Sequence, residues 1–340
     1  MVTAVRSPGR TGALHPAVAA VRTAVRRAFA ELPEQVRTAP PVVACSGGAD
    51  SLALAAATRA VRGPGVRAVV VDHGLQEGSG EVARATADLL GTLDIAAEVR
   101  RVEVTGPGGP EAAARRARYA ALRAARPDAR SPVLLGHTLD DQAETVLLGL
   151  GRGSGPRSLA GMRPWDAPWL RPLLGIRRTT TRQACEALGL PVWDDPHNSD
   201  PRYTRVRLRR EVLPLLEEVL AGGVAEALAR TAAQLREDCD ALDSLAADLL
   251  TAAREESGLA VEPLSTAPAA VRRRVLRRWL LDEAGVPELT DRHLRAADDL
   301  VGRWRGQGAV TLPGGLDLQR GDGRLVVRRR HPSERTSRPS

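Results

Sequence analysis

The stretch that decides the fold reads PVVACSGGADSLALAAATRAVR and spans residues 41–62. It begins with a short apolar run at 42–45, which is typical of a buried strand. Gly47 and Gly48 follow, and then a helical run at 52–62. A strand that turns through glycine into a helix aims several backbone N–H groups at one point, together with the positive end of the helix dipole. The stretch therefore predicts a phosphate-binding loop.

The polar residues of this loop indicate its chemistry. A Walker A loop requires a lysine, and the chain contains none. Asp50 would be repelled by bound phosphates unless a divalent cation lay between them, so we interpret Asp50 as a magnesium ligand. Ser46 and Ser51 can donate hydrogen bonds to phosphate. The structural alternative is a plain glycine turn in which Asp50 and Ser51 cap the helix.

The pattern around the loop predicts an α/β fold. Between residues 40 and 150, short β-branched runs alternate with helical stretches of ten or more residues, which indicates a parallel sheet with crossover helices. We expect strands at 42–45, 66–71, 98–104 and 133–135, and helices at 16–32 and 179–188. Residues 151–169 are rich in Gly, Pro and Ser and predict a long loop.

A glycine pair at 222–223 marks a domain junction. A long alanine- and leucine-rich helix is expected at 224–256, then helices at 269–283 and 290–301 and a hairpin-like segment at 309–327. We therefore predict a catalytic domain at 1–222, a helical linker at 223–262, a small and mainly helical domain at 263–328, and a disordered tail at 329–340.

Composition narrows the class of protein. A net charge of +8 and a pI near 10.7 favour a polyanionic partner, because cations that neutralise phosphates release condensed counterions. Cys45, Cys185 and Cys239 form no C-x-x-C pair, which argues against a zinc ribbon or an Fe–S site. We see no signal peptide and no apolar run long enough to span a membrane, and so we expect a cytoplasmic protein with no membrane partner.

A second constellation, GHTLDDQAET at residues 136–145, follows an apolar strand and opens a helix. The carboxyl end of a strand is where α/β sheets bind ligands. His137, Asp141 and Glu144 have the spacing of neighbours on one helix face. Asp141 could supply a second magnesium ligand, His137 a nucleotide contact, and Glu144 a carboxylate for a cationic amine. The alternative is a helix start whose Asp140 and Asp141 favour the dipole.

A third segment, EAAARRARY at 111–119, places Arg115 and Arg118 on one side of a helix. By itself, this pattern is typical of a solvated basic face.

Taken in order, these segments resemble the tRNA(Ile)-lysidine synthetases, a family of PP-loop ATP pyrophosphatases. The family motifs SGGxDS, DHxL, EAxARxxRY and GHxxDDQAET correspond to residues 46–51, 72–75, 111–119 and 136–145. Later blocks at 151–162, 171–174 and 193–209 extend the resemblance over about residues 40–215. Gln76, Ser158 and Val206 stand where the family commonly has arginine, glycine and asparagine, and these departures concern fine substrate contacts.

The resemblance implies a reaction in two halves. ATP, with Mg²⁺, first adenylates the C2 oxygen of the wobble cytidine in the CAU anticodon of tRNA(Ile), and pyrophosphate leaves. Free L-lysine then attacks C2 with its ε-amine and expels AMP, which changes decoding from AUG to AUA. Family members commonly carry a helical linker and a small tRNA-binding domain after the catalytic domain. The oligomeric state is left open, with a homodimer as one option.

The resemblance also assigns roles to residues. Asp50, Arg115 and Asp141 are the expected catalytic residues, with Arg115 at the α-phosphate and Mg²⁺ held between Asp50 and Asp141. The remaining assignments are ATP binding by Ser46, Gly47, Gly48, Ala49, Asp50, Ser51 and His137; lysine binding by His137, Asp141 and Glu144; and tRNA binding by Arg115, Arg118, Arg152, Arg205 and Arg207.

Other functions are weighed against this one. A PP-loop thiolase acting on tRNA would share the fold, but it generally needs paired cysteines or an Fe–S cluster. NAD or GMP synthesis would leave the basic excess without a use, and no amidotransferase segment is present. A non-catalytic RNA-binding protein with a nucleotide-binding fold is the alternative from another class, and the presence of Asp50, His137 and Asp141 argues against it.

Overall fold

The computed structural model describes residues 14–330 apart from 75–77, 108, 154 and 196–199. The chain forms two compact units, residues 1–234 and 235–340, and helix α11 (Val224–Ala253) runs through the division between them. The tail was predicted to begin at residue 329, but Arg329 is the last residue of a strand, so that start was wrong. Residues 331–340 and the departure at Gln76 lie outside the described residues.

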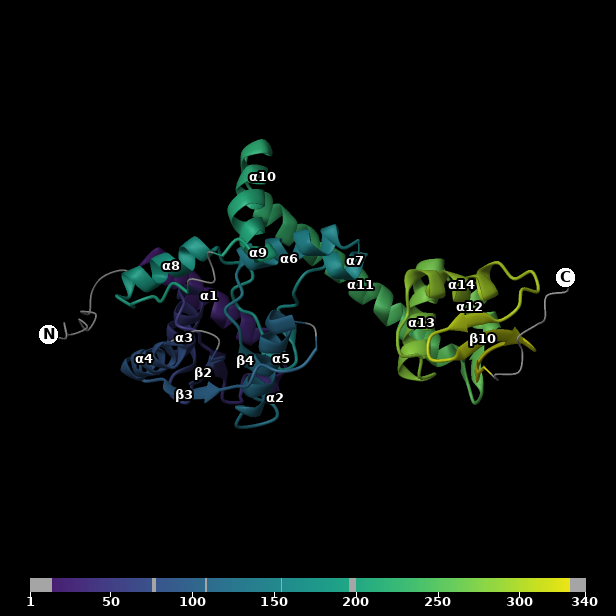
Figure 1. Cartoon of the computed structure of the whole chain (residues 1–340), viewed down its shortest axis with the longest axis horizontal. Helices are drawn as coiled ribbons and strands as arrows, with labels where there is room; N and C mark the ends of the chain where they lie inside the picture. The colour runs from purple at the N-terminus through teal and green to yellow at the C-terminus, as the bar shows by residue number, and fades with distance from the viewer. Residues whose placement is uncertain (1–13, 75–77, 108, 154, 196–199, 331–340) are drawn as a thin grey trace. The chain divides into compact units, whose positions relative to one another are not determined.

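The first unit is built on the predicted parallel sheet (Figure 1). Its strand order is β3-β2-β1-β4-β6-β5, and only β5 runs antiparallel to its neighbour. The strands are β1 (Val42–Ala44), β2 (Arg67–Asp72), β3 (Ala96–Arg101), β4 (Val133–Leu134), β5 (Trp165–Asp166) and β6 (Trp169–Leu170). Because β1 is paired on both sides, its carboxyl end opens at the centre of the sheet edge.

Helices cover both faces of this sheet, as its alternating side chains require. Val43 faces a core shared with α1 (Pro16–Ala30), α3 (Ala49–Arg62) and α8 (Arg178–Ala187), which pack against one another. Val42 faces the other side, where α5 (Gly109–Ala124) contributes Leu122 and Tyr119. Helix α4 (Ser79–Thr92) packs on β2 and β3. The helices predicted at 16–32 and 179–188 are therefore confirmed.

The segment predicted as a loop at 151–169 is more ordered than its composition suggested. It contains α7 (Pro156–Leu159) and the β5–β6 pair. Gln142 of α6 (Leu139–Gly151) holds it, because its side chain accepts from Met162 N at 2.7 Å and donates to Met162 O at 3.1 Å. A Cβ at Gly161 would lie 2.7 Å from Gln142 Oε1, so this contact requires glycine.

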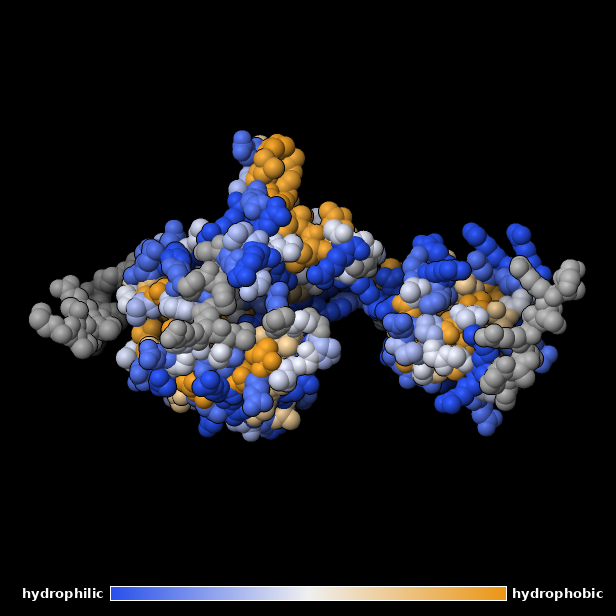
Figure 2. All heavy atoms as spheres, in the orientation of Figure 1, coloured by the Kyte–Doolittle hydropathy of each residue, from blue (hydrophilic) through white to orange (hydrophobic). Residues whose placement is uncertain are grey.

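The remaining described helices of this unit are one that precedes β1 and three that follow the sheet in sequence. They are α2 (Glu34–Arg37), α9 (Thr204–Arg207), the π-helix η2 (Leu208–Val212) and α10 (Leu213–Val219). Val206 of α9 is buried. Three apolar side chains in and beside α10, those of Leu215, Val219 and Leu220, are 57–69% exposed and form the apolar tip visible at the top of Figure 2.

The second unit combines helices with an antiparallel sheet of order β7-β8-β11-β10-β9. Its helices are α12 (Val261–Ser265), α13 (Ala269–Asp282) and α14 (Asp291–Gly302); its strands are β7 (Arg254–Glu255), β8 (Gly258–Ala260), β9 (Val310–Leu312), β10 (Leu316–Gly321) and β11 (Arg324–Arg329). The predicted hairpin is thus part of a larger sheet, since α11 ends at Ala253, β7 pairs with β8, and β8 pairs with β11. A Cβ on Gly258 would lie 2.1 Å from Leu325 O, so this strand can approach β11 only through a glycine.

The basic run at 272–274 serves the core of this unit as well as its surface. Arg272 is 8% exposed and donates to Asp298 Oδ1 at 2.5 Å, and Arg273 lies 3.3 Å from the other oxygen of Asp298. Arg274 pairs with Asp243 of α11 at 2.8 Å. These arginines tie α13 to α14 and to α11.

Removing the carboxylate of Asp298 should therefore destabilise the chain. Asp298→Ala leaves two arginines without their buried partner, and we expect a loss of about 3 kcal/mol in the free energy of unfolding. Urea unfolding followed by circular dichroism measures it. Asp282→Ala is the control, because its pair with Arg278 is 4.0 Å long and exposed, and its loss should cost less than about 1 kcal/mol. Equal losses in the two variants would contradict the structural role of Asp298.

Candidate active site

The phosphate loop joins β1 to α3, with Gly48 as the N-cap of the helix. Ser51 folds the loop on itself: its hydroxyl accepts from Ser46 N at 3.1 Å and donates to Gly48 O at 2.9 Å. Gly47 has φ +84°, and a Cβ there would lie 2.6 Å from Thr86 Oγ1 of α4. No side chain caps α3, so Asp50 and Ser51 do not have the simple capping role that was the structural alternative.

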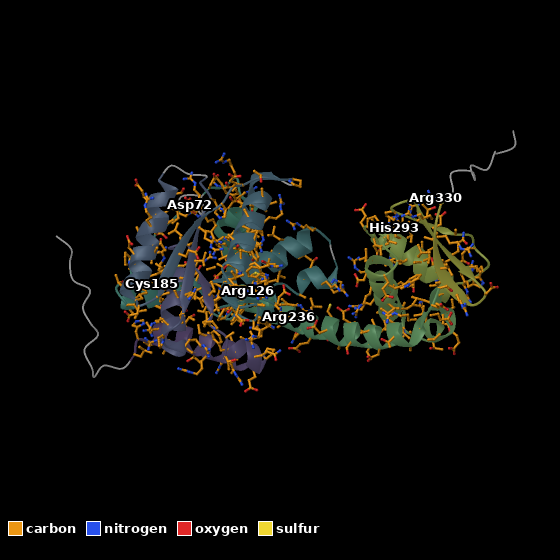
Figure 3. The ribbon with its side chains drawn as sticks, turned by 90° about the horizontal axis from the view of Figure 1, so that it is seen from below. Asp72, Arg126, Cys185, Arg236, His293 and Arg330 are labelled. Carbon is orange, nitrogen blue, oxygen red and sulfur yellow. The ribbon has the colours of Figure 1, made fainter. Side chains whose placement is uncertain are left out.

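A cavity of about 790 Å³ lies at the carboxyl ends of β1, β2 and β4. Its wall includes most of the predicted site residues, namely Ser46, Gly48, Ala49, Asp50, Ser51, Arg118, His137 and Asp141. Asp72, labelled in Figure 3, ends β2 on the same wall and accepts from Gly74 N at 2.9 Å and Ser79 Oγ at 2.7 Å. The loop and the second constellation, 90 residues apart in the chain, thus share one cavity, as the topology of a parallel sheet predicts.

Asp50 points toward α8. Its Oδ2 accepts from Arg178 Nε at 3.3 Å, and its Oδ1 accepts from the hydroxyl of Thr181. Burial raises the pKa of the Asp50 carboxyl, although Arg178 and Thr181 act in the opposite direction. The carboxylate is therefore held in a desolvated place by one cation and one hydroxyl.

Asp141 occupies the first turn of α6 and has two kinds of partner. Its Oδ2 accepts from Thr138 N and Thr138 Oγ1, both at 2.8 Å, in a capping box. Its Oδ1 accepts from Arg178 Nη2 at 2.6 Å. Burial alone would raise the pKa of Asp141, but Arg178 and the Thr138 hydrogen bond outweigh it and lower that pKa. One guanidinium therefore bridges the two carboxylates predicted to hold magnesium.

His137 does not lie on the helix face where the sequence placed it. Helix α6 begins at Leu139, so His137 belongs to the turn before the N-cap, Thr138. Burial, with Arg171 and Arg118 nearby, holds the pKa of His137 well below its usual range, despite the opposing charge of Asp141. Its Nδ1 is buried without a hydrogen-bond partner among the described residues. The cavity therefore contains a neutral imidazole with an unused polar atom.

Glu144 is fully buried, does not line the cavity, and is surrounded by arginines. Its Oε1 accepts from Arg209 Nε at 2.7 Å, and its Oε2 lies 3.6 Å from Arg205 Nη1. Arg178 Nη1 is 3.9 Å from Oε1. A cationic amine that approached Glu144 would therefore compete with guanidinium groups already in place.

The two predicted arginines of α5 differ in placement. Arg118 lines the cavity, and its Nε is buried without a hydrogen-bond partner among the described residues. Arg115 lies outside that wall and donates to the hydroxyl of Tyr119 at 3.0 Å, with its guanidinium 4.7 Å from the ring centre. Arg115 must leave Tyr119 before it can contact an α-phosphate.

The other predicted RNA-binding arginines are not among the residues that line the cavity. Arg152 is the exposed C-cap of α6, and Arg207 is exposed and pairs with Glu211 at 2.9 Å. Arg205 also donates to Thr145 Oγ1 at 3.3 Å, so it is partly engaged inside the unit. Two of the three thus present their charge at the surface.

Sequence analysis missed Arg178 and Arg209. The sequence did contain a signal for Arg178. Two arginines stand at the start of α8, where the helix dipole disfavours positive charge, and the first turn of this helix contains no acidic residue. Arg177 is likewise engaged, with Glu226 at 2.6 Å and with Asp140 and Glu217 at 3.4 Å. The cost of placing arginines at this helix start is thus offset by carboxylates from other elements.

A magnesium ion fits this donor set without further protein ligands. Mg²⁺ commonly takes one or two carboxylates and completes its shell with water and substrate phosphates. Asp50 and Asp141 supply two carboxylates, both already bound to a cationic group. Across the described ranges, no cluster of three or more His, Cys, Asp or Glu side chains could hold a metal by itself.

Comparison with known proteins identifies the family. Residues 21–216 match the PP-loop domain family, and residues 259–330 match the TilS substrate binding domain. The tRNA(Ile)-lysidine synthase of Nocardia farcinica is 60% identical over 317 residues, which cover 91% of this chain and 98% of that protein. The enzyme of the same name from Rhodococcus erythropolis is 57% identical over 93% of this chain and 94% of its own. The chain belongs to the tRNA(Ile)-lysidine synthase family.

Membership confirms the function class predicted from the motifs. As a lysidine synthase family member, the chain is an ATP-using ligase that forms a carbon–nitrogen bond on tRNA, and the alternatives are not favoured. A U34-tRNA thiolase from Methanococcus maripaludis has the same fold, with a TM-score of 0.53 at 19% identity over 65% of this chain and 80% of that one. In the part of the chain that the structure describes, no helix has the length and apolar character to cross a membrane.

The geometry of the phosphate loop predicts the effect of one substitution. Gly47→Ala introduces a methyl group at positive φ and against Thr86, so we expect a loss of about 1–3 kcal/mol in stability from the backbone alone. The contact with Thr86 should also displace the loop and weaken ATP binding by roughly tenfold. Equilibrium binding of a non-hydrolysable ATP analogue measures the second effect.

Gly63→Ala is the matched control for Gly47→Ala. Gly63 ends the same helix α3 at φ +72°, and a Cβ there meets nothing within 4 Å. It should lose stability to a similar extent and keep its affinity for the analogue. Unchanged affinity in Gly47→Ala would show that the loop tolerates the shift.

Proposed function

We propose that this enzyme ligates L-lysine to C2 of the wobble cytidine in the CAU anticodon of tRNA(Ile), with release of AMP and pyrophosphate. The change converts AUG decoding to AUA decoding. The observation that carries the proposal is the convergence of the phosphate loop, Asp50 and Asp141 on one cavity, in a chain that spans nearly the full length of its lysidine synthase relatives.

In the first half-reaction, residues 46–51 bind the phosphates of ATP through backbone N–H groups and the hydroxyls of Ser46 and Ser51. Asp50 and Asp141 would hold Mg²⁺, which neutralises charge on the phosphates as the cytidine oxygen attacks the α-phosphorus. Arg118 faces the cavity and suits the α-phosphate, and Arg115 could join it after leaving Tyr119. Pyrophosphate is the leaving group.

In the second half-reaction, the ε-amine of lysine attacks C2, a bond from nitrogen to C2 forms, and the C2–O bond breaks as AMP leaves with its electron pair. The amine must arrive without its proton. His137 is the best placed partner, because its neutral ring can accept a hydrogen bond from the amine inside a water-poor cavity. Asp141 and Glu144 supply negative charge nearby, and a cationic group of the incoming lysine would bind them in competition with Arg178 and Arg209.

The tRNA is contacted outside the cavity. Arg152, Arg205 and Arg207 belong to the first unit but do not line the cavity, and residues 259–330 supply the substrate-binding domain of the family. The basic excess favours a phosphate backbone as partner. The proposal places the enzyme in the cytoplasm, where tRNA and free lysine meet, and leaves its oligomeric state open, with a homodimer as one option.

The decisive measurement is ATP-dependent incorporation of radiolabelled lysine into a tRNA(Ile) transcript with the CAU anticodon. Asp50→Asn and Asp141→Asn should each lower the rate roughly a hundredfold or more, because each removes charge that opposes the developing phosphate charge. A transcript with another anticodon is the substrate control. Pyrophosphate release without lysine transfer would indicate a different nucleophile and would overturn the proposal.

A further inference from the structure

We propose that Arg178 is a resident cation that occupies the magnesium position of the ATP-free enzyme, and that magnesium binds there only when ATP draws the guanidinium away. Arg178 is then a positioning residue, which acts through Asp50 and Asp141. The inference rests on the proposed metal role of these two carboxylates.

The guanidinium of Arg178 connects three helices. It donates to Asp50 of α3 at 3.3 Å and to Asp141 of α6 at 2.6 Å, while its own backbone belongs to α8. The side chains of Arg178, Asp50 and Asp141 are 26%, 23% and 16% exposed, so water screens their charges only in part. Without a cation between them, the two carboxylates would repel each other in this setting.

All four carboxylate oxygens already have partners. Thr181 donates to Asp50 Oδ1, and Thr138 donates twice to Asp141 Oδ2. Arg178 binds the remaining oxygen of each group. The threonine contacts fix the two carboxylates in place, whereas the guanidinium lies at the end of a long side chain. A metal ion that used these carboxylates would therefore displace Arg178 first.

The backbone of α8 is anchored, so the side chain is the part that can move. Arg178 N donates to Asp140 Oδ2 at 2.8 Å. Further along α8, Cys185, labelled in Figure 3, donates from its thiol to Ala49 O at the start of α3 at 3.3 Å. The first contact holds α8 against α6, and the second holds it against the end of the phosphate loop. Arg178 also lines the cavity, so its displaced guanidinium would remain within reach of bound phosphates.

The triphosphate is the natural acceptor for the displaced group, because guanidinium makes strong charge-assisted hydrogen bonds to phosphate oxygens. Metal alone would displace Arg178 from both carboxylates and offer it no phosphate oxygen in exchange. Metal with ATP gives the guanidinium new acceptors as it leaves the carboxylates. Arg178 thereby couples magnesium binding to nucleotide binding, and this coupling is reciprocal.

The test uses Mn²⁺ as a paramagnetic substitute for magnesium in the ATP-free, full-length protein, with free Mn²⁺ measured by electron paramagnetic resonance. Arg178→Met keeps the aliphatic length and removes the charge, and it should bind Mn²⁺ about tenfold more tightly than wild type, a size typical of coupling between ligands. The same variant should bind a non-hydrolysable ATP analogue less tightly in the presence of Mg²⁺. Arg178→Lys keeps the charge and should resemble wild type in both measurements.

Two controls separate this effect from general electrostatics and from misfolding. Arg59→Met removes one charge from the far end of α3, where Arg59 contacts Asp94 O at 3.1 Å, and it should leave Mn²⁺ affinity unchanged. Arg178→Gln removes the charge but keeps hydrogen-bond donors. It takes the place of Arg178→Met in the Mn²⁺ measurement if Arg178→Met does not fold. Adding Asp50→Asn to either variant should abolish the gain in Mn²⁺ affinity.

The outcomes separate this inference from the proposed function. If Arg178→Met and Arg178→Gln bind Mn²⁺ no more tightly than wild type, while Asp50→Asn still abolishes lysine transfer, Arg178 is not the resident cation and the proposed function stands. If Asp50→Asn leaves lysine transfer intact, the metal role of the carboxylates fails, and this inference fails with it.

Discussion

The arrangement of the active site depends on the neutralisation of carboxylates gathered at the carboxyl ends of β1 and β4. Asp50, Asp140, Asp141 and Glu144 come from α3 and α6, and the parallel topology brings these helix starts together. Negative charge at these helix starts interacts favourably with the helix dipoles, but the carboxylates lie close to one another and repel. Their repulsion is compensated by the positive charges of three arginines, which are Arg177 and Arg178 at the start of α8 and Arg209 in η2. The positions of these elements relative to the sheet are therefore fixed by charge as well as by apolar packing.

This dependence explains which features the sequence alone could predict. The phosphate loop, Asp50 and Asp141 lie in contiguous motifs whose spacing carries geometric meaning, and the parallel sheet follows from alternation of short apolar runs with helices. Arg178 lies 128 residues from Asp50 in a chain with 49 arginines, so its unusual place at a helix start could not show which carboxylates it binds. The strands β7 and β8 were missed for a related reason, because they are two and three residues long and are defined by pairing with each other and, for β8, with the distant β11.

The placement of His137 shows a limit of spacing arguments at helix ends. Neighbours at i and i+4 share a face only when both residues are helical, and the capping box at Thr138 starts α6 two residues after His137. The outcome is a division of roles. Asp141, fixed by Thr138, stays charged, while His137 is buried and neutral beside it. Two adjacent polar groups thus present opposite properties to the same cavity, one suited to a cation and the other to a neutral amine.

The use of arginine alone has a chemical consequence for a ligase that transfers an amine. A guanidinium stays protonated at any pH at which the protein is folded, so it offers no free electron pair to an activated carbon. Arg118 and Arg178 can therefore stand beside an adenylated base and neutralise phosphate charge without attacking it. A lysine in place of Arg118 would put a competing ε-amine in the cavity, and desolvation would favour its neutral, nucleophilic form. In a cavity lined by arginine, an amine nucleophile has to be supplied by the substrate.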